Sequence, residues 1–367
     1  MIRSLATFFL VINLALPMAP APHAQEKAPR GEKTECGTVV PPGQVQAELA
    51  REAFAALASP PPTDAPYYLP LTIHIVHRGD GTGGFRPPQL EVAMRDLNRM
   101  WQPVGVQFFI YGEIDHINDD TRFNVPNDQA ARDALRQVNV VANTINVYFT
   151  NLASLCGQST FTTGAIQGIL MSNGCAGNTD SPSSFAHEIG HYLDLYHTHE
   201  TSFGVECPKG NNCSTAGDRL CDTAADPGLG SRVDTDCVYD DSAATPMSCD
   251  QTPYNPPTRN LMSYSTEVCR DQFTGNQISK ALRVLRDTAN RRNLITSVAR
   301  YVDPLSGASG GNCNYNSPCR TVAKAVQAAQ DGDFIFLKPG AHEALSLGGK
   351  RVTLNRWGTA GLVEIAP

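Results

Sequence analysis

Apolar residues alternate with polar ones, or run together, in four segments that we predict to be β-strands. These segments are residues 68–77, 106–111, 145–149 and 166–171. In the first segment every second residue is apolar, which places the apolar side chains on one side of a strand. Leu69, Leu71, Ile73 and Ile75 form this set.

A period of three to four residues follows in other segments and predicts helices. Leu90, Met94, Leu97 and Trp101 show it in residues 89–101, and Phe185, Ile189, Tyr192 and Tyr196 show it further on. Ser181 followed by Pro182 is a typical start for the second helix. A third helix is predicted near residues 277–287. Strands interspersed with helices indicate a mixed α/β fold above an irregular lower part.

The stretch 300–367 has a pattern of its own. A helix that follows Pro318 and ends at Ala329 precedes an apolar run at 334–337 and the stretch Arg351-Val352-Thr353-Leu354. This order looks like the entry cap and first coils of a right-handed parallel β-helix, with too few coils to cover the last strand edge. Such modules occur in polysaccharide-active and adhesive surface proteins. The alternative is a small globular appendage.

The beginning of the chain reads as a secretory signal. Met1-Ile2-Arg3 leads into an apolar run and then small residues up to Ala24, which predicts a signal peptide over residues 1–24. No second run is long and apolar enough to span a membrane. The formal net charge of −7 and the isoelectric point near 5.7 argue against nucleic acid as a partner.

Three histidines carry the chemistry. His187 and His191 are four residues apart and share a helix face, and His197 follows six residues later. Three neutral imidazole nitrogens can hold Zn²⁺ and leave one position open for water. Glu188 can take a proton from that water as it attacks a carbonyl group and pass it to the leaving amine. The pattern therefore predicts hydrolysis of peptide bonds.

Four motifs together resemble one protein family. The chain is similar to the pappalysin family of metzincins, in its cytophagalysin branch, in three motifs: HEIGHYLDLYHTHE at 187–200, GDRLCDT at 217–223 and NLMSYSTEVC at 260–269. A fourth motif, ECGT at 35–38, resembles a short pro-segment motif of that family. The resemblance covers roughly Cys36 to Arg292. It implies a metzincin-like catalytic domain of the α/β (α+β) class, with a zinc helix and a Met-turn.

The resemblance also assigns roles to residues near the metal. Met262 would be the apolar floor of the Met-turn beneath the histidines, although a core methionine in an ordinary loop is the alternative. Tyr264 would donate a hydrogen bond to the developing oxyanion or act as a weak fifth ligand. Asp194 stands where metzincins have glycine at the helix end, and aspartate tolerates a left-handed backbone. We therefore expect Asp194→Gly to be tolerated.

Eleven cysteines favour an oxidising compartment. Ten of them allow five disulfides. Family-like pairing would join Cys221 to Cys249 and Cys237 to Cys269. Proximity in the chain favours Cys207–Cys213 and Cys313–Cys319, and Cys156–Cys175 would brace the segment before the helix. Cys36 is left over. Its thiolate is a strong zinc ligand, so we predict a latency switch, against the alternatives of an intermolecular disulfide or an unpaired thiol.

Acidic residues crowd the lower part of the predicted domain. They are Asp218, Asp222, Asp226, Asp234, Asp236, Asp240 and Asp241. A structural Ca²⁺ ion would suit their oxygens, and a solvated acidic loop is the alternative. His199 and Glu200 follow the third histidine and would either support the metal site or lie in a solvated turn.

The segment after the Met-turn walls the pocket for the residue that follows the scissile bond in metzincins. Glu267 is the only charge between Ser265 and Cys269. A carboxylate at the base of this pocket predicts cleavage before Arg or Lys, and a solvent-facing glutamate is the alternative. The strand at 166–171 would border the cleft and pair with an extended substrate.

The sequence therefore predicts a secreted zinc endopeptidase made as a latent precursor, with association to the cell surface as a further expectation. We predict a signal peptide at 1–24, a pro-segment and linker at 25–66, a catalytic domain at 67–297 and a C-terminal module at 298–367. One alternative function is a surface adhesive or carbohydrate-binding protein with an auxiliary protease domain. A zinc-binding protein without activity is disfavoured by Glu188.

Overall fold

The computed structural model describes residues 34–50, 66–240, 249–296, 298–315, 317–357 and 362–366. The predicted signal peptide, the proline-rich break at 59–63 and Asp241 lie outside these ranges. No helix within them is long and apolar enough to cross a membrane.

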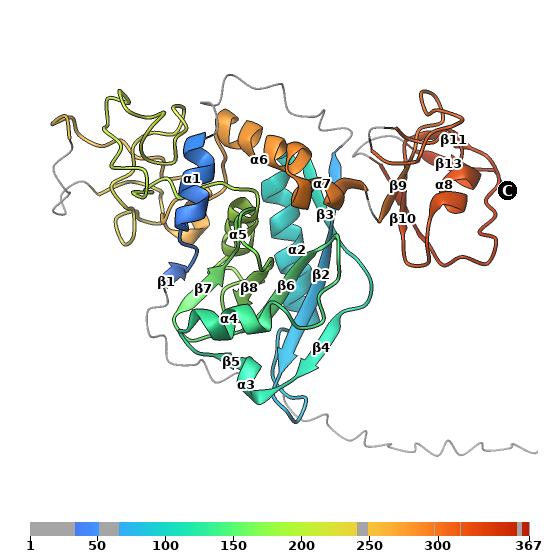
Figure 1. Cartoon of the computed structure of the whole chain (residues 1–367), viewed down its shortest axis with the longest axis horizontal. Coiled ribbons are helices and arrows are strands. Elements are labelled where there is room, and N and C mark those ends of the chain that lie inside the picture. Colours follow the sequence, from blue (N-terminus) through green and yellow to red (C-terminus); the bar gives the residue numbers. More distant parts are fainter. Residues whose placement is uncertain are drawn as a thin grey trace, which may run out of the picture. The chain divides into compact units, whose positions relative to one another are not determined.

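A mixed sheet forms the centre of the catalytic part (Figure 1). Its strands are β1 (Thr34–Cys36), β2 (Tyr67–His77), β3 (Val106–Ile110), β4 (Asp115–Asn118), β5 (Asn124–Val125), β6 (Ile145–Leu152), β7 (Leu155–Gln158) and β8 (Ile169–Ser172). Along the main path the order is β1-β7-β8-β6-β2-β3, while β4 pairs with β2 and β5 with β6. All pairs are parallel except β7 with β8.

Side chains from both faces of the sheet are buried, as expected for parallel strands covered on two sides. Leu69, Leu71, Ile73 and Ile75 of β2 belong to the larger core, as the alternation predicted. Val76 of the same strand belongs to a second core on the other face. The apolar pattern therefore gave the correct strand faces.

Eight helices and two 3₁₀ turns are present in the described ranges. They are α1 (Pro42–Ala50), α2 (Pro87–Trp101), η1 (Gln102–Val104), α3 (Asp120–Phe123), α4 (Gln129–Leu135), α5 (Ser184–Tyr192), η2 (Glu267–Cys269), α6 (Gly275–Asp287), α7 (Ala289–Thr296) and α8 (Val322–Ala328). Side chains of α2, α5, α6 and α7 fill the larger core. The capping box formed by Thr274 and Gln277 fixes the start of α6.

The order of the strands corrects one expectation. The strand predicted at 166–171 is β8, and it lies between β6 and β7 rather than at an edge. β7 lies next to it and carries β1 on its other side, with Cys36 opposite Gly157. β1, from the segment before the predicted catalytic domain, thus forms this edge of the sheet in place of β8.

Five disulfides are present, and two of them differ from the predicted pairs. The bonds Cys156–Cys175, Cys237–Cys269 and Cys313–Cys319 are those predicted. Cys207 bonds to Cys249 and Cys213 to Cys221, in place of Cys207–Cys213 and Cys221–Cys249. The turn from Asn212 to Ala216 and the bend at Arg219, whose φ is 64°, return the chain so that Cys213 faces Cys221. Proximity in the chain could not reveal this reversal.

The C-terminal segment consists of short strands paired in parallel. They are β9 (Ala299–Val302), β10 (Phe334–Leu337), β11 (Gly340–His342), β12 (Thr353–Arg356) and β13 (Val363–Ile365). β10 pairs with β9 and β12, and β11 pairs with β13. Val302, Ile335 and Leu337 face α8 in a small core closed by the Cys313–Cys319 disulfide.

Candidate active site

The helix α5 presents two of the three histidines, and its end returns the third. It begins at Ser184, later than the predicted start at Ser181, and ends at Tyr192. Asp194 then adopts a φ of 59°, the left-handed conformation predicted from its place in the motif. Its buried carboxylate accepts hydrogen bonds from the backbone nitrogen and hydroxyl of Thr162, at 2.9 and 2.6 Å. These bonds fix the turn that brings His197 back to the helix.

The three imidazoles converge on one point. Nε2 of His191 lies 3.0 Å from Nε2 of His187 and 3.0 Å from Nε2 of His197. Nδ1 of His187 donates to the carbonyl oxygen of Leu261 at 2.7 Å, and Nδ1 of His191 donates to that of Leu195 at 2.8 Å. These two rings therefore turn unprotonated Nε2 atoms toward the same space.

Burial keeps the histidines neutral. It lowers the pKa of His191 to about 3 and the pKa values of His187 and His197 well below their usual range. Converging lone pairs in a buried site repel one another unless a cation lies between them. The donor set, three neutral imidazoles, fits a divalent metal ion such as zinc.

Cys36 lies at the same point. Its Sγ atom and the three histidine nitrogens are all within 4.8 Å of one another. Burial, followed by the negative charge of Glu188, raises the pKa of the Cys36 thiol well above its usual value. Sulfur and three imidazoles form a four-donor set of the kind that closes a tetrahedral zinc site.

Glu188 lies under the segment that carries Cys36. The hydroxyl of Thr38 donates to Oε2 of Glu188 at 3.1 Å and accepts from the backbone nitrogen of Ser159 at 2.8 Å. Burial raises the pKa of Glu188 to about 7, and hydrogen bonds from Cys36 and Thr38 oppose the rise. A Cβ atom at Gly157 would lie 2.6 Å from Oε1 of Glu188, so the strand must carry glycine here.

The predicted Met-turn lies beneath the helix. A Cβ atom at Gly190 would approach Sδ of Met262 to 2.4 Å, so α5 and this loop pack in direct contact. The backbone nitrogen of Thr198 donates to the carbonyl oxygen of Met262 at 3.1 Å. The hydroxyl of Tyr264 donates to the carbonyl oxygen of Cys36 at 3.0 Å, and its ring lies 4.8 Å from that of His197.

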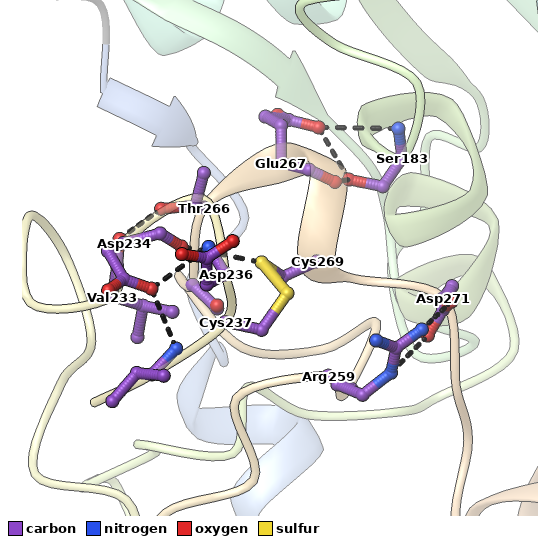
Figure 2. The surroundings of a disulfide bond; sticks show 12 residues. Ser183, Val233, Asp234, Asp236, Cys237, Arg259, Thr266, Glu267, Cys269 and Asp271 are labelled. Carbon is purple, nitrogen blue, oxygen red and sulfur yellow. Dashed lines mark hydrogen bonds and ion pairs between the residues drawn. A yellow bond between two sulfur atoms is a disulfide. The ribbon is translucent and has the colours of Figure 1, made fainter.

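Glu267 does not face a substrate pocket in the way that we predicted. Its Oε2 accepts from the hydroxyl of Ser183 at 2.5 Å (Figure 2). Its Oε1 accepts from the hydroxyl of Ser184 at 2.5 Å. The guanidinium group of Arg270 pairs with the same carboxylate. The start of α5 attracts an anion, so this carboxylate lies at the start of the helix, with its charge already paired with that of Arg270. The Cys237–Cys269 disulfide anchors the segment.

The acidic residues of the lower part separate into two kinds. Asp222 caps α6 through Thr274 and Asn276, and Asp234 accepts from the backbone of its own turn. Asp218 is different, because its Oδ2 atom, Oε2 of Glu206 and Oγ1 of Thr223 are buried without a hydrogen-bond partner. Burial raises the pKa of Asp218 to about 7 and that of Glu206 to about 8.

His199 lies beside the metal site rather than in a solvated turn. Its ring stacks on that of His197 at 4.9 Å and lies 4.4 Å from that of Tyr264. Glu200 accepts hydrogen bonds from the backbone of Thr201 and Ser202. These contacts divide the pair: His199 packs against the site, and Glu200 shapes the following turn.

Several residues around the site were not predicted from the sequence. Thr38, Gln44, Glu48 and Lys280 contact the site or its surroundings through bonds between distant parts of the chain. Only Thr38, as part of ECGT, lay in a motif. Glu48 is one of several glutamates in the predicted pro-segment, and neither it nor the lysine of α6 has a spacing signal that sets it apart.

Comparisons with known proteins relate the chain to metalloproteases. Residues 141–286 match the family model Peptidase_M43, described as pregnancy-associated plasma protein-A. The extracellular metalloprotease 1 of Coccidioides posadasii is 26% identical over 268 residues, which are 68% of this chain and 88% of the relative. The extracellular metalloprotease of Arthroderma otae is 28% identical over 265 residues, 67% and 87% respectively. Mature mirolysin of Tannerella forsythia with a cleaved peptide aligns with a TM-score of 0.45 and 19% identity over 63% of this chain and 96% of that chain.

Proposed function

We propose that this chain, which carries a metalloendopeptidase domain of the pappalysin family, is secreted as a latent zinc enzyme that hydrolyses proteins with Glu188 as general base. The observation that carries the proposal is the convergence of three buried Nε2 atoms, at 3.0 Å separations, beside a buried glutamate. Secretion is supported by the five disulfides and by relatives that are named extracellular metalloproteases.

His187, His191 and His197 would hold the zinc ion. When bound, zinc supplies a Lewis acid that polarises the scissile carbonyl group and makes a water molecule more acidic. Glu188 then removes a proton from the attacking water and delivers it to the leaving nitrogen. A carboxylate beside the metal position is suited to both steps, because it can accept a proton and release it again. The hydroxyl of Tyr264 would donate a hydrogen bond to the developing oxyanion.

We propose that in the precursor residues 34–38 block the metal site, Glu188 and Tyr264 at the same time. The thiol of Cys36 fills the fourth position around the metal site, and Thr38 holds Glu188. The hydroxyl of Tyr264 is engaged by the carbonyl oxygen of Cys36. Latency would therefore depend on the bonded segment as a whole rather than on the thiol alone.

Three measurements on one set of samples test this proposal. Purified precursor should cleave a quenched fluorescent protein substrate only after its pro-segment is removed before Tyr67, and a zinc chelator should abolish the activity. Glu188→Ala should still bind one zinc per molecule yet lose on the order of 10³-fold or more in activity. Glu91→Ala, at an exposed position of α2, serves as the matched control. Activity retained by Glu188→Ala would refute the mechanism.

A calcium ion is proposed at Asp218. Two buried carboxylates and the hydroxyl of Thr223 each leave an oxygen atom unpartnered, and hard cations are bound by such oxygen atoms. Ca²⁺ would offset the cost of burying both charges. The proposal is tested by calcium-dependent thermal stability, described below.

For the rest of the chain we infer the predicted division, with a signal peptide at 1–24, a pro-segment and linker at 25–66, a catalytic domain at 67–297 and a C-terminal module at 298–367. The parallel pairing of β9, β10 and β12 supports the first coils of a β-helix in the C-terminal module. Expression of residues 1–297 tests the boundary: the shorter chain should fold and, after removal of its pro-segment, cleave protein substrates.

A further inference from the structure

A second contact between the pro-segment and the protease involves two buried charges. Glu48, on α1, places Oε1 3.2 Å from Nζ of Lys280 and accepts at Oε2 from the hydroxyl of Tyr196 at 3.2 Å. The side chains of Lys280 and Glu48 are 0% and 2% exposed. Both carboxylate oxygens thus have their own donor in a site closed to solvent.

The donors of this site belong to the protease and not to the pro-segment. Lys280 comes from α6, and Tyr196 directly precedes the third histidine. Nζ of Lys280 lies 3.9 Å from the ring centre of Tyr196, a cation–π contact that holds the ammonium group in place. Burial lowers the pKa of Lys280, and the charge of Glu48 opposes this most, followed by Asp194 and Asp218. The two donors therefore come from the protease, while Glu48 supplies the main anion.

The same residues connect this site to the metal centre. The ring of Tyr196 lies 5.5 Å from that of Phe161, which lies 5.7 Å from that of His191. Val40 of the pro-segment packs against Phe161 and Tyr196, between the segment that carries Thr38 and the helix that carries Glu48. In the pro-segment, the loop after Cys36 and the helix α1 together span the distance from the histidines to Lys280.

We propose that Lys280 and Tyr196 form a carboxylate-binding subsite of the processed enzyme, which recognises an acidic side chain of the protein substrate after Glu48 has left with the pro-segment. This inference rests on the proposed function, because it requires removal of the pro-segment. A buried ammonium group is costly without an anion beside it. The substrate carboxylate takes the place of Glu48 and gains the same two charge-assisted hydrogen bonds.

Cleavage-site profiling of the processed enzyme with a proteome-derived peptide library is the first test. We expect Asp or Glu to be enriched at one position on one side of the scissile bond. Two peptides that differ only by Glu or Gln at that position then give a ratio of kcat/KM. The Glu peptide should be favoured by about 10-fold or more, the effect of a buried charge-assisted hydrogen bond.

Variants assign the preference to the two donors. Lys280→Met keeps the aliphatic stem and should bring the Glu to Gln ratio to about 1, and Tyr196→Phe should lower it partly. The pair Glu48→Lys with Lys280→Glu keeps opposite charges together during folding and should reverse the preference toward a Lys peptide. Arg283→Met, which removes a cation from the same helix, is the control and should leave the ratio unchanged.

The outcomes separate this inference from the proposed function. A wild-type profile without acidic enrichment, or an equal enrichment in Lys280→Met, overturns the subsite while cleavage itself still supports the zinc peptidase. Absence of any chelator-sensitive cleavage by the processed wild type would instead refute the proposed function. Reversal of the preference by the charge exchange would establish the subsite even if Lys280→Met folds poorly.

Discussion

Replacement of Asp194 tests how the turn after the zinc helix is held. From the sequence we expected Asp194→Gly to be tolerated, because glycine adopts the left-handed conformation without strain. In the structure, however, the carboxylate of Asp194 is 0% exposed and accepts two hydrogen bonds from Thr162. We therefore expect Asp194→Gly to lower the stability of the folded protein rather than to be tolerated.

The magnitude follows from these contacts. A hydrogen bond to a charged group contributes about 1.5–3 kcal/mol, and loss of the acceptor leaves the backbone nitrogen of Thr162 buried. Relief of the left-handed backbone returns about 1 kcal/mol. Asp194→Gly should therefore lower the free energy of unfolding by about 2–4 kcal/mol. Asp194→Asn keeps one acceptor and should lose less, whereas Asp194→Val should lose more because a β-branched residue resists positive φ.

Urea unfolding of the metal-free precursor measures this series without the contribution of zinc affinity, and zinc titration of the same variants reports whether His197 still reaches the site. The expected order of stability is wild type, Asn, Gly and Val. Glu91→Ala, at an exposed position of α2, is the control. A glycine variant as stable as the wild type would show that the bonds to Thr162 do not fix the turn.

Three further results are expected. In a fluorogenic assay, Cys36→Ala should raise the activity of the precursor, but only to part of that of the processed enzyme, because Thr38 and Glu48 still hold the pro-segment in place. An unchanged activity would count against a cysteine switch. Full activity would exclude a role for the other contacts. Ca²⁺ should raise the melting temperature of wild type but not of Asp218→Asn, and an equal rise in both would exclude this site. Without calcium, the free energy of unfolding should fall as the pH rises from about 5 to 8. The reason is that burial raises the pKa of Asp218 to about 7 and that of Glu206 to about 8, so the folded state binds more protons than the unfolded state. A free energy of unfolding that is constant over this range would refute these pKa values.

The parts of the site that were predictable from sequence are those encoded by local spacing. His187 and His191 converge because helical geometry alone brings positions four apart onto one face, and the conformation of Asp194 follows from its place in the motif. Glu267 shows the limit. Its distance from the Met-turn suggested a pocket, but the choice between substrate and helix start depends on Ser183, Ser184 and Arg270, which only the folded chain brings together.

The same limit explains the two disulfides that were paired wrongly and the missed receptor of Glu48. Cys213 meets Cys221 because of a reversal in an irregular loop that has no periodic pattern. Glu48 and Lys280 are separated by 232 positions, and neither their burial nor their pairing leaves a trace in nearby residues. The glycan-binding role of residues 298–367 stays a prediction.

Gly157 has a consequence for how this enzyme can tolerate variety in what it cleaves. The strand β7 offers only main-chain atoms at the point opposite Cys36, because any side chain would displace Glu188. A substrate peptide aligned there would be held by backbone amide groups, which every amino acid possesses, so binding beside the scissile bond would not depend on the substrate sequence. Differences in cleavage preference would then arise from residues farther along the cleft, where mutations could alter selectivity without displacing Glu188.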